Sequence, residues 1–123
     1  MNGQVAQRHV LLSVPLRLPD GRSLAVEFVI DTGFQSALAL PPAAIAALHL
    51  SFRDTITANL ANDTYVDIDV YKAVILWNGQ ERTVDVLSTG RHPFLGTSLL
   101  EGFHMGIDFV EDGSVNIYPL SAP

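Results

Sequence analysis

A short polar stretch at the end of an apolar run is the part of this sequence that could do chemistry. Asp31, Thr32 and Gly33 directly follow Phe28-Val29-Ile30. The chain must bend here, and the glycine can take dihedrals that other residues cannot. A carboxylate held on such a bend can be presented to a ligand as a general acid or base. The sequence therefore predicts an active-site loop at residues 31–33.

One carboxylate alone is a poor catalyst at neutral pH, and Asp, Thr and Gly are also common in ordinary turns. Two carboxylates held within about 3 Å of each other cannot both ionise, so they share a proton. One then activates water while the other donates a proton to a carbonyl oxygen. A chain with one such loop needs a second copy, which a twofold homodimer supplies. We therefore expect a homodimer in which the two Asp31 side chains face each other.

The strands that position Asp31 are predicted by alternation of apolar and polar residues. Residues 9–18 alternate, and Pro15 within them favours an edge strand. Pro19-Asp20-Gly21 is a turn, after which residues 24–30 alternate again. The two runs predict a hairpin that ends at Asp31.

The middle of the chain predicts two further hairpins that share one long strand. Residues 51–60 alternate weakly, and Ala61-Asn62-Asp63-Thr64 is a tight turn. Residues 66–77 form the long strand, polar on one face near its start. Asn78-Gly79 is a strong hairpin signal, and residues 83–87 pair back across it.

Two short helices and a closing hairpin complete the predicted elements. Paired prolines predict a helix near residues 42–49, since proline suits a first helical turn. Phe94-Leu95-Gly96 repeats the apolar-then-glycine bend of the Asp31 loop. Ser98 to Glu101 is predicted to be a capping box that starts a second helix, and residues 107–117 a hairpin with Phe109 in its first strand.

These elements predict an all-β protein of about seven short strands with two short helices, a closed or nearly closed single-lobe β-barrel. With 123 residues the chain is predicted to be one domain, 1–123. Its net charge of −6 and scattered basic residues argue against nucleic acid as a partner. No long apolar run or secretion signal is visible, so we expect no membrane association and a cytoplasmic location. The absence of cysteine excludes disulfides and thiolate chemistry.

Three features of the sequence resemble the retropepsin-like (clan AA) aspartic proteases, single-lobed relatives of pepsin that act as homodimers. They are the strand and loop at residues 28–33, a hairpin in mid-chain, and Phe94-Leu95-Gly96 about sixty residues after the loop. The similarity covers nearly the whole chain. Residues 31–34, 38–42 and 70–79 are similar, more narrowly, to small bacterial and cyanobacterial members. The resemblance implies an aspartic endopeptidase that cleaves a polypeptide without a cofactor.

The resemblance also implies roles for individual residues. Asp31 is the catalytic carboxylate, Thr32 holds the loops of two subunits together by hydrogen bonds, and Gly33 allows a close backbone approach. The substrate-binding residues implied are Phe34, beside the loop, and the hairpin tip Ala61, Asn62, Asp63 and Thr64. A non-catalytic peptide-binding or interaction module with the same fold is the alternative. Phe34, where retroviral enzymes have a small residue, and a glycine-poor hairpin favour that alternative, whereas the intact Asp-Thr-Gly favours the protease.

The remaining candidates predict no metal site. The four histidines have no spacing typical of a metal site. Asp67 and Asp69 share a strand face, but no further oxygen ligands are nearby in the sequence, so we expect a solvated face. Trp77 and Phe94 are expected in the core or at a dimer interface.

Overall fold

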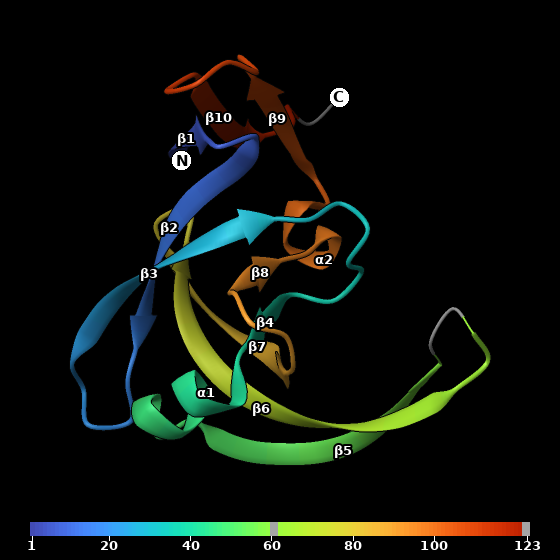
Figure 1. The fold of residues 1–123 in the computed structure, drawn as a ribbon. Coiled ribbons are helices and arrows are strands. Elements are labelled where there is room, and N and C mark those ends of the chain that lie inside the picture. The colour runs from blue at the N-terminus through green and yellow to red at the C-terminus, as the bar shows by residue number, and fades with distance from the viewer. Residues whose placement is uncertain (60–61, 122–123) are drawn as a thin grey trace.

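Strands make up most of the computed structural model, which describes residues 1–59 and 62–121 (Figure 1). In chain order the elements are β1 (Asn2–Ala6), β2 (His9–Arg17), β3 (Ser23–Ile30), β4 (Leu38–Leu40), α1 (Pro42–Leu48), β5 (Ser51–Asn59), β6 (Tyr65–Trp77), β7 (Gln80–Ser88), β8 (Phe94–Leu95), α2 (Thr97–Leu100), β9 (Phe103–Ile107) and β10 (Ser114–Pro119). The prediction of a mostly β protein with two short helices is confirmed. The predicted number of strands was too low, because β1, β4 and β8 were not recognised.

The strands form one sheet in the order β5-β6-β7-β4-β8-β3-β2-β1-β10-β9. Because β6 also pairs with β2, the strands from β6 through β7, β4, β8, β3 and β2 form a ring. The closed or nearly closed barrel stays a prediction, because the structure shows a ring of paired strands within a larger sheet. From this ring, β5 extends the sheet at one end, and β1, β10 and β9 extend it at the other (Figure 1).

The predicted hairpin that leads to Asp31 is present as β2 and β3, paired antiparallel from Leu11–Val29 to Arg17–Ser23. The alternation is also confirmed, since Leu12, Val14, Leu16 and Phe28 are all buried. The prediction that β2 is an edge strand was wrong. Its other side pairs with β1 at residues 9–11 and with β6 at residues 16–17. Pro15 lies between these two ladders, where its missing N–H costs no second-side hydrogen bond.

The two helices begin in different ways. α1 has Pro42 in its first turn, as predicted, and ends at His49, whose φ is 54°. α2 begins at Thr97, with Gly96 in the capping position and no side chain capping it. The predicted capping box at Ser98–Glu101 was therefore wrong. The helix begins at Thr97 instead, because the Thr97 N–H is bonded to the Phe34 carbonyl of the Asp31 loop.

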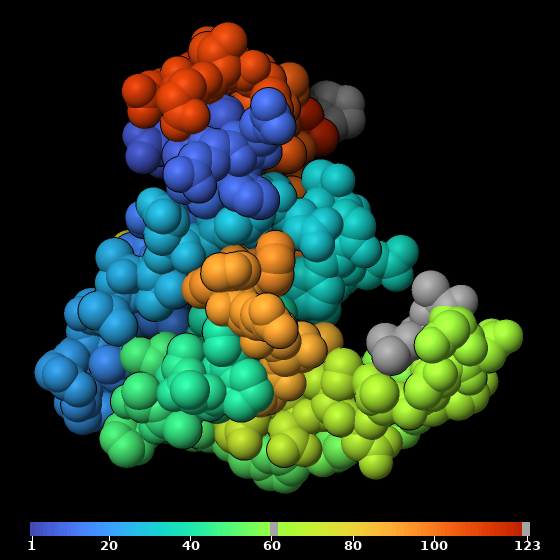
Figure 2. Space-filling view, viewed as in Figure 1, coloured from blue at the N-terminus to red at the C-terminus, as the bar shows by residue number. Residues whose placement is uncertain are grey.

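The two mid-chain hairpins are confirmed. β5 and β6 pair from Ser51–Lys72 to Asn59–Tyr65, with a register shift between Phe52 and Asp54. β6 then pairs with β7 through the predicted Asn78-Gly79 turn, whose residues have φ of 50° and 79°. The β5–β6 hairpin curves away from the ring and projects from the body of the molecule (Figures 1 and 2).

β1, β10 and β9 form a small sheet, which we call the terminal sheet, at the opposite end from this hairpin (Figure 1). The predicted closing hairpin is β9 and β10. Phe109 lies beyond the end of β9, with 59% of its surface exposed, so its predicted place in a strand was wrong. Among the helices of residues 1–59 and 62–121, none is long and apolar enough to cross a membrane.

Candidate active site

Asp31 lies at the end of β3, where two chain segments far apart in the sequence meet. β3 pairs in parallel with β8, with Val29 opposite Phe94 and Ile30 opposite Leu95. The N–H of Asp31 continues this ladder by donating to the carbonyl of Leu95 at 2.9 Å. The structure thus brings together the two apolar-then-glycine stretches that the sequence singled out.

The Asp31 loop, residues 31–36, is shaped by hydrogen bonds to Asp31 itself. Gly33 donates its N–H to the Asp31 carboxylate oxygen Oδ1 at 2.9 Å. The N–H of Phe34 donates to the Asp31 carbonyl at 3.1 Å. Asp31 is a partly buried residue, and its carboxylate is oriented because one of its oxygens accepts a hydrogen bond from the backbone of its own loop.

Gly96 lets the second segment press against the Asp31 loop. A Cβ at this position would run into the carbonyl oxygens of Ser36 and Phe34 and would come within 2.7 Å of the Phe34 ring. The N–H of Gly96 donates to the Ala37 carbonyl at 2.8 Å, and that of Thr97 donates to the Phe34 carbonyl at 2.8 Å. The Thr97 hydroxyl also donates to the Phe34 carbonyl, at 3.3 Å. The far side of the loop is therefore held by residues 96 and 97.

The other residues of the loop differ in exposure. Thr32 and Gly33 are exposed, whereas Phe34 is partly buried against Gly96. An exposed Thr32 hydroxyl is open to a second molecule. The large side chain at position 34 is accommodated because Gly96 has none.

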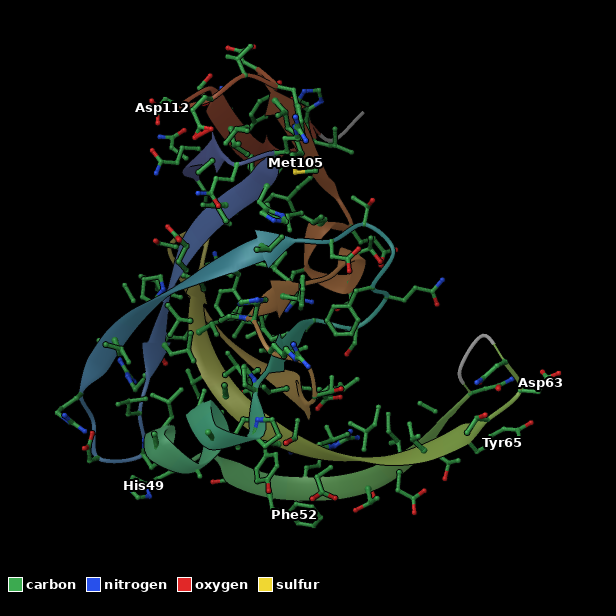
Figure 3. All side chains as sticks on the ribbon, viewed as in Figure 1. His49, Phe52, Asp63, Tyr65, Met105 and Asp112 are labelled. Atoms are coloured by element: carbon green, nitrogen blue, oxygen red, sulfur yellow. The ribbon has the colours of Figure 1, made fainter. Side chains whose placement is uncertain are left out.

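The predicted substrate-binding tip of the hairpin lies apart from Asp31. Asn62, Asp63 and Thr64 are exposed, and the Thr64 N–H donates to the Asn62 side chain at 3.2 Å. Ala61 falls outside the described residues. Asp63 lies at the far end of the hairpin (Figure 3), and open space separates the described part of the hairpin from the Asp31 loop (Figure 2). The structure does not bring these residues and Asp31 into contact within one chain.

The β5–β6 hairpin has one apolar face, which the sequence prediction did not assign to the site. Ile56 pairs with Ile68, and Ala58 pairs with Val66. These pairs share a face with Val70, which is buried in the core. Phe52 lies on the opposite, outer side of the hairpin (Figure 3). The apolar face is therefore the one turned toward the body and the Asp31 loop, although Ile56 and Val66 are 37% and 36% exposed.

Beyond Phe52, the outer face of the hairpin carries polar side chains that are joined by cross-strand hydrogen bonds. Thr55 donates its hydroxyl to Asp69 at 2.9 Å, and Thr57 donates to Asp67 at 3.0 Å. These bonds give both aspartates a structural role. Within residues 1–59 and 62–121, no three His, Cys, Asp or Glu side chains are grouped so that they could hold a metal ion.

A hollow of about 510 Å³ lies beside the loop, lined by Gln35, Thr97, Ser98, Leu100 and Glu101. Asp31 is not among these residues. The Asp31 carboxylate therefore lies outside this hollow. The candidate site is the hydrogen-bonded Asp31 loop and not the hollow.

No family model matches the sequence, and no curated protein matches it. A solved structure that it resembles is that of a retropepsin-like aspartic protease from Rickettsia conorii, with a TM-score of 0.50 and 21% identity. The match covers 98% of this chain and 95% of that one. The chain has a retropepsin-like fold. At this identity the likeness shows the arrangement of the strands and not the activity.

The retropepsin-like fold agrees with the resemblance seen in the sequence. The match spans the hairpin, the Asp31 loop and the segment around Gly96 together, because it covers nearly the whole of both chains.

Proposed function

We propose that the protein is an aspartic endopeptidase that acts as a homodimer, with one Asp31 from each chain in a shared active site. The observation that supports it most is the Asp31 loop itself. The Asp31 carboxylate accepts a hydrogen bond from the Gly33 N–H, on a loop fixed by the Leu95 carbonyl and by residues 96 and 97. A loop braced in this way keeps a reacting carboxylate in position.

In the proposed reaction the two carboxylates share one proton. The ionised Asp31 takes a proton from water as the water oxygen bonds to the peptide carbonyl carbon. The protonated Asp31 gives its proton to the carbonyl oxygen, which yields a tetrahedral diol. The Asp31 that took the proton from water then gives it to the peptide nitrogen, while the other Asp31 takes a proton from a hydroxyl of the diol. The carbon–nitrogen bond breaks, a carboxylic acid and an amine leave, and the pair again holds one proton.

The neighbouring residues have supporting roles in this proposal. The Thr32 hydroxyl hydrogen-bonds the loop of the partner and keeps the two carboxylates close. The Gly33 N–H orients Oδ1 of its own Asp31, and the lack of a side chain lets the second loop approach. The substrate lies between the Asp31 loop and the hairpin, near Phe34 and the tip residues Asn62, Asp63 and Thr64. A single substrate chain can thus touch both elements across the open space.

Asp31→Asn tests the function. The amide cannot act as a base, so cleavage of an unfolded polypeptide such as reduced casein should fall at least about 100-fold. Asp112→Asn is the matched control, with the same loss of charge in an exposed turn of the terminal sheet (Figure 3). It should retain wild-type activity.

The non-catalytic alternative predicts other results in the same assay. A binding module would cleave nothing at any pH between 3 and 8, and its affinity for a peptide would survive Asp31→Asn. A purified wild-type dimer that shows this behaviour would overturn the protease proposal.

A further inference from the structure

The long strand β6 changes partners where the β5–β6 hairpin joins the ring. Its pairing with β5 ends at Ser51–Lys72, and its pairing with β2 begins at Arg17–Val74. Ala73 lies between these two ladders and is paired with neither strand. β5 and β2 diverge from this point, and a hollow of about 370 Å³, which we call the junction hollow, is lined by residues from both sides.

The junction hollow has aliphatic walls that belong to the folded body of the protein. Leu18 and Pro19 come from the β2–β3 turn, Leu50 from the segment after α1, and Ala73 and Val74 from β6. Figure 1 shows this turn and α1 side by side at one end of the molecule. Leu18, Leu50 and Ala73 are buried, so their positions are fixed by the core. The hollow is thus preformed, and its volume lies in the lower part of the range for small-molecule sites, about 300–1,000 Å³.

Two cations and no carboxylate line the junction hollow, although the chain as a whole has a net charge of −6. The cations are Arg17 and Lys72, one from each of the two ladders beside Ala73. Arg17 forms an ion pair with Glu81, which does not line the hollow. A guanidinium has five N–H donors, so this pair leaves others available to a ligand. The charge of the hollow therefore favours an anion.

Lys72 makes no ion pair with a carboxylate of the described residues. Asp85 lies opposite Lys72 in the β6–β7 ladder, but it is bonded to Arg53, with 3.0 Å between Oδ2 and Nη1. Asp20, which follows Pro19 in the turn, accepts hydrogen bonds from the backbone and the side chain of Arg22. Because these neighbouring carboxylates are bonded to other residues, the Lys72 ammonium is available to a ligand.

We propose that the junction hollow binds a small organic carboxylate with an aliphatic body. The carboxylate pairs with Lys72 and with the remaining donors of Arg17, and the aliphatic part covers the walls at Leu18, Leu50 and Val74. An anion without an apolar body would bury none of this apolar surface and so would gain less free energy on binding. The inference goes beyond the proposed peptidase, since no residue of the Asp31 loop lines the hollow.

An NMR titration of the intact protein with octanoate tests the proposal. The amides of Leu18, Leu50 and Thr83, all residues of the hollow, should shift and reach saturation. The amides of Val115 and Ile117 in the terminal sheet should stay unchanged. Octanamide has the same chain without the charge, and acetate has the charge without the chain. Each should bind at least about fivefold more weakly than octanoate, because each lacks one of the two contacts.

Variants at position 72 test the contribution of the charge. Lys72→Met keeps an apolar side chain and removes the ammonium, so the affinity for octanoate should fall about fivefold or more, whereas the affinity for octanamide should not change. Lys72→Arg should restore the affinity for octanoate. Arg91→Met is the matched control, because Arg91 is an exposed cation that does not line the hollow. It should bind octanoate as wild type does.

Two sources could supply a carboxylate of this kind, a free fatty acid and the C-terminus of a peptide. N-acetyl-leucine carries the carboxylate and the aliphatic side chain of a peptide end, and its affinity is compared with that of octanoate. Tighter binding of octanoate assigns the site to a fatty acid, and tighter binding of N-acetyl-leucine assigns it to a peptide end. Either result supports the carboxylate site, provided that Lys72→Met weakens it.

Three results would overturn the proposal. They are octanamide binding as tightly as octanoate, an unchanged affinity for octanoate in Lys72→Met, and shifts that do not saturate or that spread over the terminal sheet. The outcome is separate from the proposed activity, because Asp31→Asn should bind octanoate as tightly as wild type. Loss of the peptidase proposal would therefore leave this site standing, and the reverse also holds.

Discussion

At the scale of single residues, Gly96 decides how closely the two halves of the site can approach. Gly96→Ala would force a Cβ into the carbonyls of Ser36 and Phe34, both of which are fixed backbone atoms. Overpacking against backbone that cannot move should cost about 1–3 kcal/mol of unfolding free energy. Thermal unfolding at fixed protein concentration measures this loss.

Gly33→Ala is the matched control for Gly96→Ala. A Cβ at position 33 would meet only the Asp31 oxygen Oδ1, at 3.2 Å. Its effect on stability should stay within about 1 kcal/mol, because a side-chain oxygen can shift by a few tenths of an ångström. Equal loss of stability in the two variants would mean that Gly96 does not brace the loop as described.

Sequence patterns were informative about these residues to different degrees. Asp31 and the glycines could be predicted because a carboxylate, a bend and an apolar run are adjacent in the chain. The packing of Phe34 on Gly96 could not be predicted, because the two residues lie about sixty positions apart in the sequence and meet only in the folded chain. The same contact explains the wrong capping box, since Thr97 is bonded to Phe34 and the helix begins there.

At the scale of elements, the two faces of the β5–β6 hairpin should differ in function. Ile56→Ala removes apolar surface from the face turned toward the Asp31 loop. For a peptide with apolar residues near the cleaved bond, kcat/KM should fall about tenfold, as expected for lost methylene contacts in an apolar site. Steady-state kinetics on such a peptide measures the change.

Thr57→Ala, one position along on the other face, is the control for Ile56→Ala. It removes the hydrogen bond to Asp67 on the outer side and should leave kcat/KM unchanged. A similar fall in both variants would show that hairpin stability, and not contact with the substrate, controls the rate.

Strands could be predicted where apolar and polar residues alternate along the strand itself. β2, β3 and β6 show it clearly, since each has one buried face. β1 has one fully buried residue, Val5, and exists because β2 and β10 lie on either side of it. β4 is three residues long and buried on both faces between β7 and β8, so no alternation could appear. Such strands are set by contacts distant in the sequence.

At the scale of the whole molecule, the proposed site belongs to the pair of chains and not to either one. A heterodimer of wild-type and Asp31→Asn chains would hold one carboxylate that can act as a base and no partner to share its proton. Such a dimer should be inactive. The inactive chain should therefore inhibit the wild-type enzyme by taking its subunits.

Mixing the two chains tests this dependence directly. After wild-type protein exchanges subunits with an equal amount of Asp31→Asn chain, random pairing leaves about half of the wild-type subunits in wild-type dimers, so activity should fall to about half. Asp112→Asn chain is the control, because it keeps Asp31, so mixing with it should leave the activity per active chain unchanged. Wild-type activity that stays constant as Asp31→Asn chain is added would mean that each chain works alone, and the shared Asp31 site would have to be abandoned.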